Sequence, residues 1–73
     1  MSKLPLISGK KAARAFEKDV WIFSRQHGSH MIYEKSECET ILSIPDHREL
    51  DKGLLRHLIK DAQLTVDDFI ALT

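Results

Sequence analysis

Two histidines flank a Gly-Ser pair in the segment RQHGSHMIY, which covers residues 25–33. Imidazole is the side chain best suited to accept and donate protons near neutral pH, so His30, directly after the expected turn, is the first candidate for chemistry. Arg25 on the preceding strand is placed to balance the charge of a bound phosphodiester. His30 could then deprotonate a ribose 2′-hydroxyl, and attack of that oxygen on the adjacent phosphorus would leave a 2′,3′-cyclic phosphate and a free 5′-hydroxyl. Such a reaction requires no metal ion.

The same histidines also have plainer explanations. A histidine in a hairpin is often an ordinary turn residue, and the spacing alone does not decide between that role and catalysis for His30. His27 is a candidate second proton donor, a candidate phosphate contact, or an exposed turn residue. The pair lacks a nearby carboxylate or thiolate, so we expect no metal site. Ser29 lacks an oriented base, which argues against a serine hydrolase.

A helix is expected over residues 9–19, because Ser8 is a good N-cap and apolar residues recur at helical spacing. At ~100° per residue, its cations fall within an arc roughly a quarter-turn wide, opposite the apolar side. They are Lys10, Lys11, Arg14 and Lys18. Cations in the first turn oppose the helix dipole, so their presence there can mark a phosphate-binding site. An ordinary solvated helix surface is the alternative.

β-Branched and aromatic residues are dense in residues 20–26 and again in 30–35, with the Gly-Ser turn between them, which predicts a β-hairpin. A third strand is expected over residues 40–44, ended by Pro45. The alternation of apolar residues does not cleanly show which side of the hairpin is buried. We favour four side chains as the buried ones: Trp21, Phe23, Leu42 and Ile44.

The C-terminal part of the chain has the pattern of two helices. Asp51 can cap a helix whose apolar stripe runs to Ala62, and Thr65 can cap a short final helix with Asp68 in the capping-box position. The resulting order is α-β-β-β-α with a terminal helical turn. It predicts an α+β fold in which helices cover one face of a three-stranded antiparallel sheet and leave the other face open. Residues 1–73 are expected to form one domain.

Composition restricts the function classes further. The chain carries 11 basic and 11 acidic residues, so its net charge of zero gives no general attraction to polyanions. The basic residues are concentrated up to residue 35 and the acidic ones after it, which permits a nucleic-acid surface at one end. Cys38 has no cysteine partner, which is typical of a reduced cytoplasmic protein. No apolar run approaches the ~18 residues of a membrane span, and no cleavable leader is recognisable.

Four segments together resemble the small HicA-type toxins, also called the YcfA-like family, over nearly the whole chain. They are LPLISGKKAARAFEKD (residues 4–19), RQHGSHMIY (25–33), SIPDHREL (43–50) and DKGLLRHLIKDAQLTVDDFIAL (51–72). The resemblance implies a fold like the double-stranded-RNA-binding domain and the activity of a ribosome-independent mRNA interferase, an endoribonuclease without a cofactor. It also implies that His30 is the catalytic histidine and that Gly28 and Ser29 shape its turn.

The resemblance further implies two partners. One is mRNA, bound mainly through its backbone at a surface for which we expect the residues Lys10, Lys11, Arg14, Arg25 and His27. The other is a HicB-type antitoxin that covers this region and neutralises the toxin. Two features depart from the family, because members commonly carry lysine at the position of His27 and many are clearly basic. A non-catalytic RNA-binding or protein-docking domain of the same fold is the alternative function.

Overall fold

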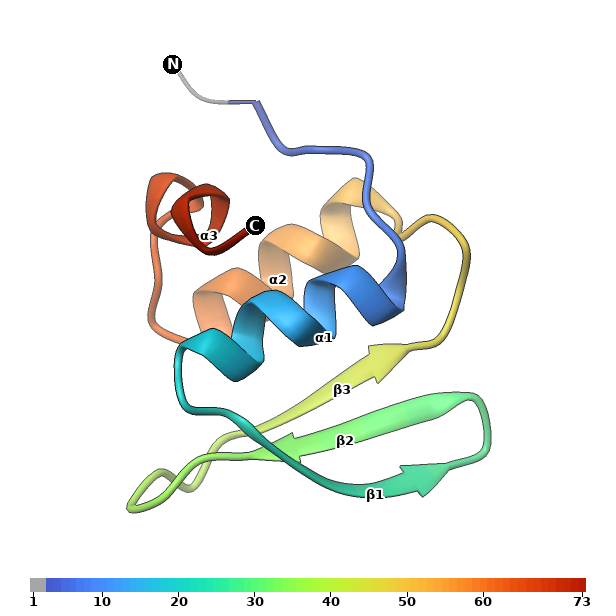
Figure 1. Cartoon of the computed structure of the whole chain (residues 1–73), viewed down its shortest axis with the longest axis vertical. Coiled ribbons are helices and arrows are strands. Elements are labelled where there is room, and N and C mark those ends of the chain that lie inside the picture. Colours follow the sequence, from blue (N-terminus) through green and yellow to red (C-terminus); the bar gives the residue numbers. More distant parts are fainter. Residues whose placement is uncertain (1–2) are drawn as a thin grey trace.

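The computed structural model describes residues 3–73. The elements are α1 (Gly9–Lys18), β1 (Ile22–His27), β2 (His30–Glu34), β3 (Ile41–Pro45), α2 (Lys52–Asp61) and α3 (Val66–Leu72). The strands form one antiparallel sheet in the order β1-β2-β3, and the helices lie on one side of it (Figure 1). The predicted α+β fold, with its α-β-β-β-α order and one open sheet face, is confirmed. In this part of the chain no helix has the length and apolarity needed to cross a membrane.

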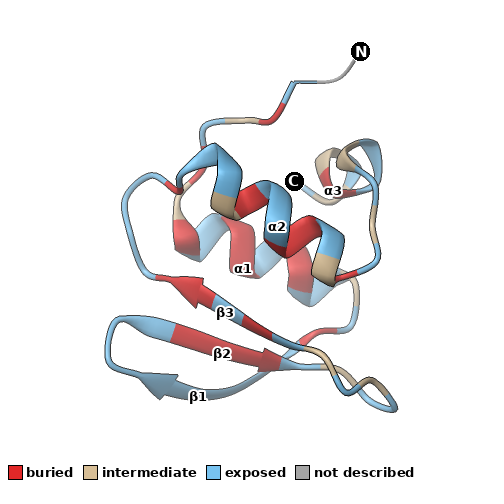
Figure 2. Cartoon of the chain, turned by 180° about the vertical axis from the view of Figure 1, so that it is seen from behind, coloured by how far each residue is buried: buried red, intermediate tan, exposed pale blue. Residues whose placement is uncertain are grey.

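The face of the sheet that contacts the helices, here called the inner face, holds the core. α1 and α2 both pack on β3, and α3 packs on the other two helices. Leu42 and Ile44 of β3 are fully buried there, as predicted, and Met31 and Tyr33 of β2 join them. Figure 2 shows the buried residues of the sheet on β2 and β3, whereas β1 is exposed along its length. Burial of these apolar side chains is the main source of stability.

Alternate residues of the same strands lie on the opposite face, here called the outer face, which none of the described helices covers. By the strand register, this face carries Ile22, Arg25 and His27 from β1, His30, Ile32 and Glu34 from β2, and Ile41, Ser43 and Pro45 from β3. It is the open face that the sequence predicts.

Trp21 is buried, as expected. Phe23 lies on the inner face, as expected, because it pairs with Tyr33, but its expected burial is wrong. Phe23 is 48% exposed. It lies on β1, an edge strand that extends beyond the helices, and its ring packs edge-on against Tyr33 with 5.7 Å between the centroids. A β-bulge between Phe23 and Arg25 also shifts the register, which simple alternation does not anticipate.

β1 begins at Ile22, whereas the sequence predicts a strand from Val20, because the chain first has to end α1. Val20 has a φ of 63°, the left-handed conformation that usually belongs to glycine at a helix C-terminus. Its N–H donates to Glu17 O at 3.1 Å, and the N–H of Trp21 donates to Phe16 O at 3.2 Å. Together these two bonds form a Schellman cap. Valine is β-branched and favours strands, so residue propensity alone does not predict a helix cap at Val20.

Backbone contacts fix the hairpin turn against the end of β3. Gly28 has a φ of 62°, and with Ser29 it forms the expected two-residue turn between β1 and β2. Ser29 O accepts a hydrogen bond from Asp46 N–H at 2.8 Å. The turn is therefore anchored to the residue that comes directly after β3.

The start of α1 packs against the same end of β3. Gly9 N–H donates to His47 O at 2.9 Å, and a Cβ on Gly9 would lie 1.8 Å from Pro45 O. Only glycine fits so close an approach. Pro45 is also the register partner of His30. The beginning of α1 and the beginning of β2 therefore both lie beside Pro45.

The predicted helix caps are present. The Ser8 side chain accepts the N–H of Lys11, and the Asp51 side chain accepts N–H groups from the first turn of α2. At α3, the Thr65 hydroxyl accepts the N–H of Asp68 while the Asp68 carboxylate accepts the N–H of Thr65. Because these caps satisfy N–H groups that have no partner within the helix, they fix where each helix begins.

Candidate functional site

His30 is the first residue of β2 and lies exposed on the outer face. Its ring nitrogen Nδ1 lies 3.0 Å from Ser43 Oγ, which is a hydrogen-bond distance. Ser43 belongs to β3 and is a diagonal neighbour of His30 on the same face, because His30 pairs with Pro45. The other ring nitrogen, Nε2, has no hydrogen-bond partner among residues 3–73. It is available to meet a ligand.

Sequence reasoning missed Ser43. It lies 13 positions from His30 along the chain, and only the register between β2 and β3 brings the two side chains together. A serine in a strand carries no pattern that shows which group its hydroxyl will reach. One signal was present, since the predicted burial of Leu42 and Ile44 places the residue between them on the open face.

His27 pairs directly with His30 across the hairpin turn. Residues opposite each other in an antiparallel pair share a face, with Cα atoms roughly 4.5–5.5 Å apart. Both side chains are exposed, and within residues 3–73 the side chain of His27 makes no hydrogen bond or ion pair. The two imidazoles can therefore reach one ligand at the tip of the hairpin. Nowhere in the described residues do three or more His, Cys, Asp or Glu side chains group as metal ligands.

Arg25 also lies on the outer face, where the register places Arg25, Ile32 and Ser43 in one row across the sheet. Its Nη1 lies 3.6 Å from Glu34 Oε2, and both side chains are at least half exposed. An ion pair in such contact with water is weak, so a bound phosphate can compete with Glu34 for the guanidinium. Ile32, in the same row, is only 8% exposed although no described helix covers it.

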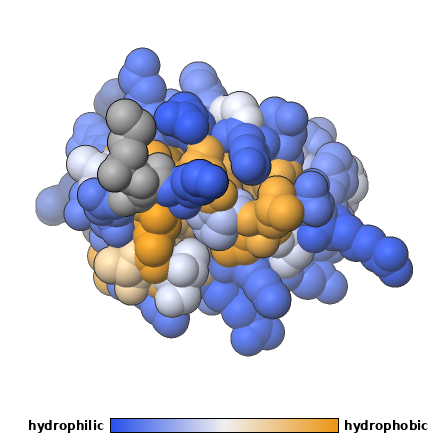
Figure 3. All heavy atoms as spheres, turned by 90° about the horizontal axis from the view of Figure 1, so that it is seen from above, coloured by the Kyte–Doolittle hydropathy of each residue, from blue (hydrophilic) through white to orange (hydrophobic). Residues whose placement is uncertain are grey.

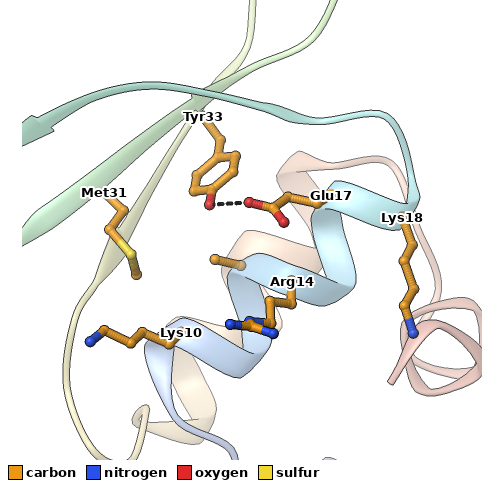
Figure 4. A pocket seen from close by; sticks show the side chains of 7 residues that line it. Lys10, Arg14, Glu17, Lys18, Met31 and Tyr33 are labelled. Atoms are coloured by element: carbon orange, nitrogen blue, oxygen red, sulfur yellow. Dashed lines mark hydrogen bonds between the residues drawn. The ribbon is translucent and has the colours of Figure 1, made fainter.

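Two of the predicted RNA-binding residues, Lys10 and Arg14, lie on the helix side of the sheet. They line a hollow of about 520 Å³ between α1 and the inner face of β2 (Figure 4). Lys18, a third member of the cationic arc, lies at the same hollow. The complete lining is Lys10, Ala13, Arg14, Glu17, Lys18, Met31 and Tyr33. The hollow therefore combines three cations with apolar and aromatic surface.

A short hydrogen bond forms one wall of this hollow. The Tyr33 hydroxyl donates to Glu17 Oε2 at 2.6 Å, drawn as the dashed line in Figure 4. Burial, followed by this hydrogen bond and the negative charge of Glu17, raises the pKa of Tyr33 to about 12, while Arg14 opposes the shift. Tyr33 therefore stays protonated near neutral pH and remains a fixed donor.

Lys11 lines a smaller hollow of about 170 Å³ on another side of α1. The other residues around that hollow are Ile7, Arg14, Ala15, Lys18, Leu72 and Thr73. Viewed from the end of the molecule that carries the N-terminal segment and α3, apolar side chains form patches among hydrophilic ones (Figure 3). The cationic arc is exposed, as predicted, but it spans two hollows, with Lys10 at one and Lys11 at the other.

The predicted site residues thus fall into two groups. His30, His27 and Arg25 share the outer face, next to the turn formed by Gly28 and Ser29. The cations of α1 lie on the helix side of the sheet. Among residues 3–73 no hydrogen bond or ion pair joins the groups directly. The start of α1, next to Lys10, and the hairpin turn both contact the end of β3 and the residues directly after it.

The comparison with known families covers both groups. The family model described as HicA toxin of bacterial toxin-antitoxin matches residues 9–64, from the start of α1 to just beyond α2. The matched part includes every predicted site residue. No curated protein matches the chain. Because the family match spans most of its length, the chain belongs to the HicA toxin family of bacterial toxin-antitoxin systems.

Proposed function

We propose that the chain is an mRNA interferase, a metal-independent endoribonuclease that cleaves mRNA in the cytoplasm and is neutralised by a HicB-type antitoxin. Membership of a toxin family supports the biological role. The observation that carries the chemistry is the exposed His30 ring, with Nδ1 within hydrogen-bond distance of Ser43 and Nε2 available on the open face of the sheet. An imidazole held in this way can exchange a proton with a bound polymer.

In the proposed reaction, Nε2 of His30 removes the proton from a ribose 2′-hydroxyl. The 2′-oxygen forms a bond to the adjacent phosphorus, and the bond from phosphorus to the 5′-oxygen of the next nucleotide breaks. His27, the cross-strand neighbour of His30, donates a proton to the departing 5′-oxygen. Arg25 on the same face balances the negative charge that develops on the phosphate. The products are a 2′,3′-cyclic phosphate and a 5′-hydroxyl.

The cations of α1 bind the RNA backbone on either side of the scissile phosphate. Lys10 comes directly after Gly9, whose backbone lies against Pro45, and Pro45 is the register partner of His30. An RNA strand at the hairpin tip can therefore continue from the outer face toward the hollow that Lys10 and Arg14 line. Contacts to phosphate are independent of sequence and weaken with salt.

The antitoxin covers the outer face. Ile22 and Ile41 are 65% and 49% exposed, and in the register both align with Glu34, one on each side. Exposed aliphatic side chains on an uncovered sheet face are a suitable surface for a protein partner. A partner bound there would also block access to His30.

The test is expression of His30→Gln alone, without antitoxin. We expect the wild type to arrest growth and shorten mRNA half-lives, and His30→Gln to lose both effects, with cleavage reduced by about 10²–10⁴-fold in vitro. The matched control is His57→Gln on α2, which should behave as wild type. Cleavage should persist in excess chelator and leave 5′-hydroxyl ends. Equal cleavage by wild type and His30→Gln would refute the catalytic role.

The alternative is an RNA-binding domain without catalysis, and the neutral net charge is the observation that favours it. It predicts that RNA binding falls steeply with salt, that no cleavage occurs, and that His30→Gln changes little. The same expression experiment therefore distinguishes the two functions.

A further inference from the structure

Ser43 is the one side chain to which the described structure connects His30 by a hydrogen bond. Its neighbours along β3, Leu42 and Ile44, are fully buried on the inner face. Their burial anchors the backbone on both sides of Ser43, so its hydroxyl is carried by one of the most constrained positions of the sheet. The backbone of His30 is held between the two neighbouring strands, by its pairing with His27 of β1 and with Pro45 of β3.

We propose that Ser43 is a positioning residue for His30. Its hydroxyl accepts a hydrogen bond from Nδ1–H, which leaves Nε2 unprotonated and facing the solvent. This inference rests on the proposed function, because it assigns which nitrogen of the catalytic ring faces the RNA.

Proton abstraction by His30 requires that one particular ring nitrogen carry the lone pair. A neutral imidazole carries its proton on one nitrogen and a lone pair on the other, and only the nitrogen with the lone pair can act as a base. If the proton stayed on Nε2, the lone pair would be on Nδ1, where it faces Ser43 and not a bound RNA. The Ser43 hydroxyl can donate or accept at Nδ1. The accepting arrangement is the one that keeps the proton on Nδ1, holds the rotation of the ring and leaves the lone pair on Nε2.

The same contact is suited to both states of the ring. When Nε2 takes a proton from the 2′-hydroxyl, His30 becomes an imidazolium in which Nδ1 still carries its hydrogen. The Ser43 hydroxyl therefore remains the acceptor, and no rearrangement is needed during proton transfer. Serine has a single side-chain torsion that orients its oxygen, so little conformational freedom is lost in holding this geometry.

The experiment compares wild type with Ser43→Ala, Ser43→Thr and Ser24→Ala. Nitrogen-15 NMR of the imidazoles reports the tautomer of His30 without any need for activity. RNA cleavage by the same proteins gives kcat and KM. Ser43→Thr keeps a hydroxyl and suits a strand, and Ser24→Ala is the matched control, because it removes an exposed serine from β1 of the same sheet. Thermal unfolding checks that each variant is folded.

We expect the Nδ1–H tautomer to dominate in the wild type and in Ser43→Thr, and the population to move toward Nε2–H in Ser43→Ala. Loss of about one hydrogen bond should lower kcat of Ser43→Ala by about tenfold, with KM nearly unchanged. Ser43→Thr should restore kcat, and Ser24→Ala should match the wild type in both measurements.

The inference is overturned if the wild type holds the Nε2–H tautomer, or if Ser43→Ala changes neither the tautomer nor kcat while His30→Gln abolishes cleavage. In that second case the proposed function survives and only the role of Ser43 fails. If no protein cleaves RNA, the proposed function fails, and with it the catalytic meaning of the contact, although NMR still decides whether Ser43 selects the tautomer.

Discussion

The inner and outer faces of the sheet are built from the same strands but are put to different uses. On β3, Leu42 and Ile44 are completely buried under the helices, whereas Ile41 and Ser43, next to them in sequence, are exposed. On β2, Met31 and Tyr33 face the core while His30 and Glu34 face away from it. The alternation of a β-strand therefore separates the core residues from the proposed catalytic residues one position at a time.

The energies on the two faces differ in kind. Full burial of a large aliphatic side chain contributes about 1.5–3 kcal/mol, and the inner face holds several. The exposed ion pair of Arg25 with Glu34 on the outer face contributes at most about 1 kcal/mol. Substitutions on the inner face should therefore unfold the protein, whereas those on the outer face should change activity in a folded protein. Substitutions at both faces and at the helix caps test this division, from the largest expected effect to the smallest.

Leu42 and Ile41, adjacent residues on β3, give the most direct test of the difference between the inner and outer faces. We expect Leu42→Ala to lower the free energy of unfolding by about 3 kcal/mol, because it leaves a cavity beneath the helices. Ile41→Ala, on the outer face, should cost less than about 1 kcal/mol. Urea unfolding followed by circular dichroism measures both. Similar losses in the free energy of unfolding for the two variants would show that outer-face residues contribute as much to stability as the core.

On the outer face, His27→Asn should lower kcat for RNA cleavage by about a hundredfold, because the departing oxygen loses its proton donor. Stability in urea should not change. His47→Asn is the control, since His47 is an exposed histidine in the loop after β3. His27→Lys separates the two possible roles of this residue. Full activity in His27→Lys would assign His27 to phosphate binding, since an ammonium group is a poor proton donor at neutral pH.

Tyr33→Phe tests the wall of the inner hollow. Losing the hydrogen bond to Glu17 should reduce the free energy of unfolding by about 1 kcal/mol at neutral pH. The pKa of Tyr33 is raised in the folded protein, so its contribution is fully present below the ordinary pKa of ~10 and is lost as pH rises through about 12. The stability advantage of wild type over Tyr33→Phe should therefore shrink as pH rises from ~10 toward about 12. Parallel profiles from pH ~9 upward would contradict this.

The smallest change in stability is expected at Val20, just after the C-terminal end of α1. Val20 is 66% exposed and has a positive φ, so Val20→Gly removes strain and loses little burial. Glycine has more conformational freedom in the unfolded chain, which offsets part of this gain. The free energy of unfolding should rise by about 0.5–1 kcal/mol, and RNA cleavage should not change. Gln63→Gly at the matching cap of α2, where φ is 61°, should gain less because glutamine is not β-branched. A loss of stability in Val20→Gly would mean that the valine side chain is needed.

The features that the sequence predicts best are local ones. Ser8, Asp51 and Thr65 are recognisable as caps because each stands within three residues of the N–H groups that its side chain accepts. Two predictions were wrong: that Val20 begins a strand and that Phe23 is buried. Val20 adopts a conformation that its β-branched side chain disfavours, and the exposure of Phe23 depends on segments that are distant in sequence. The edge position of β1 exposes Phe23, and no pattern within β1 reveals that it is an edge strand.

For the candidate site, the sequence alone determined the residue types and their local setting: a histidine after a Gly-Ser turn, a second histidine before it, and cations along one arc of a helix. Family motifs added the expected chemistry. Tertiary structure alone decided that His30 meets Ser43, that the histidines share the open face, and that the cations of α1 lie on the other side. The reason is physical. Spacing along a helix or strand is set by backbone geometry, whereas strand register and the choice of covered face are set by contacts between distant segments.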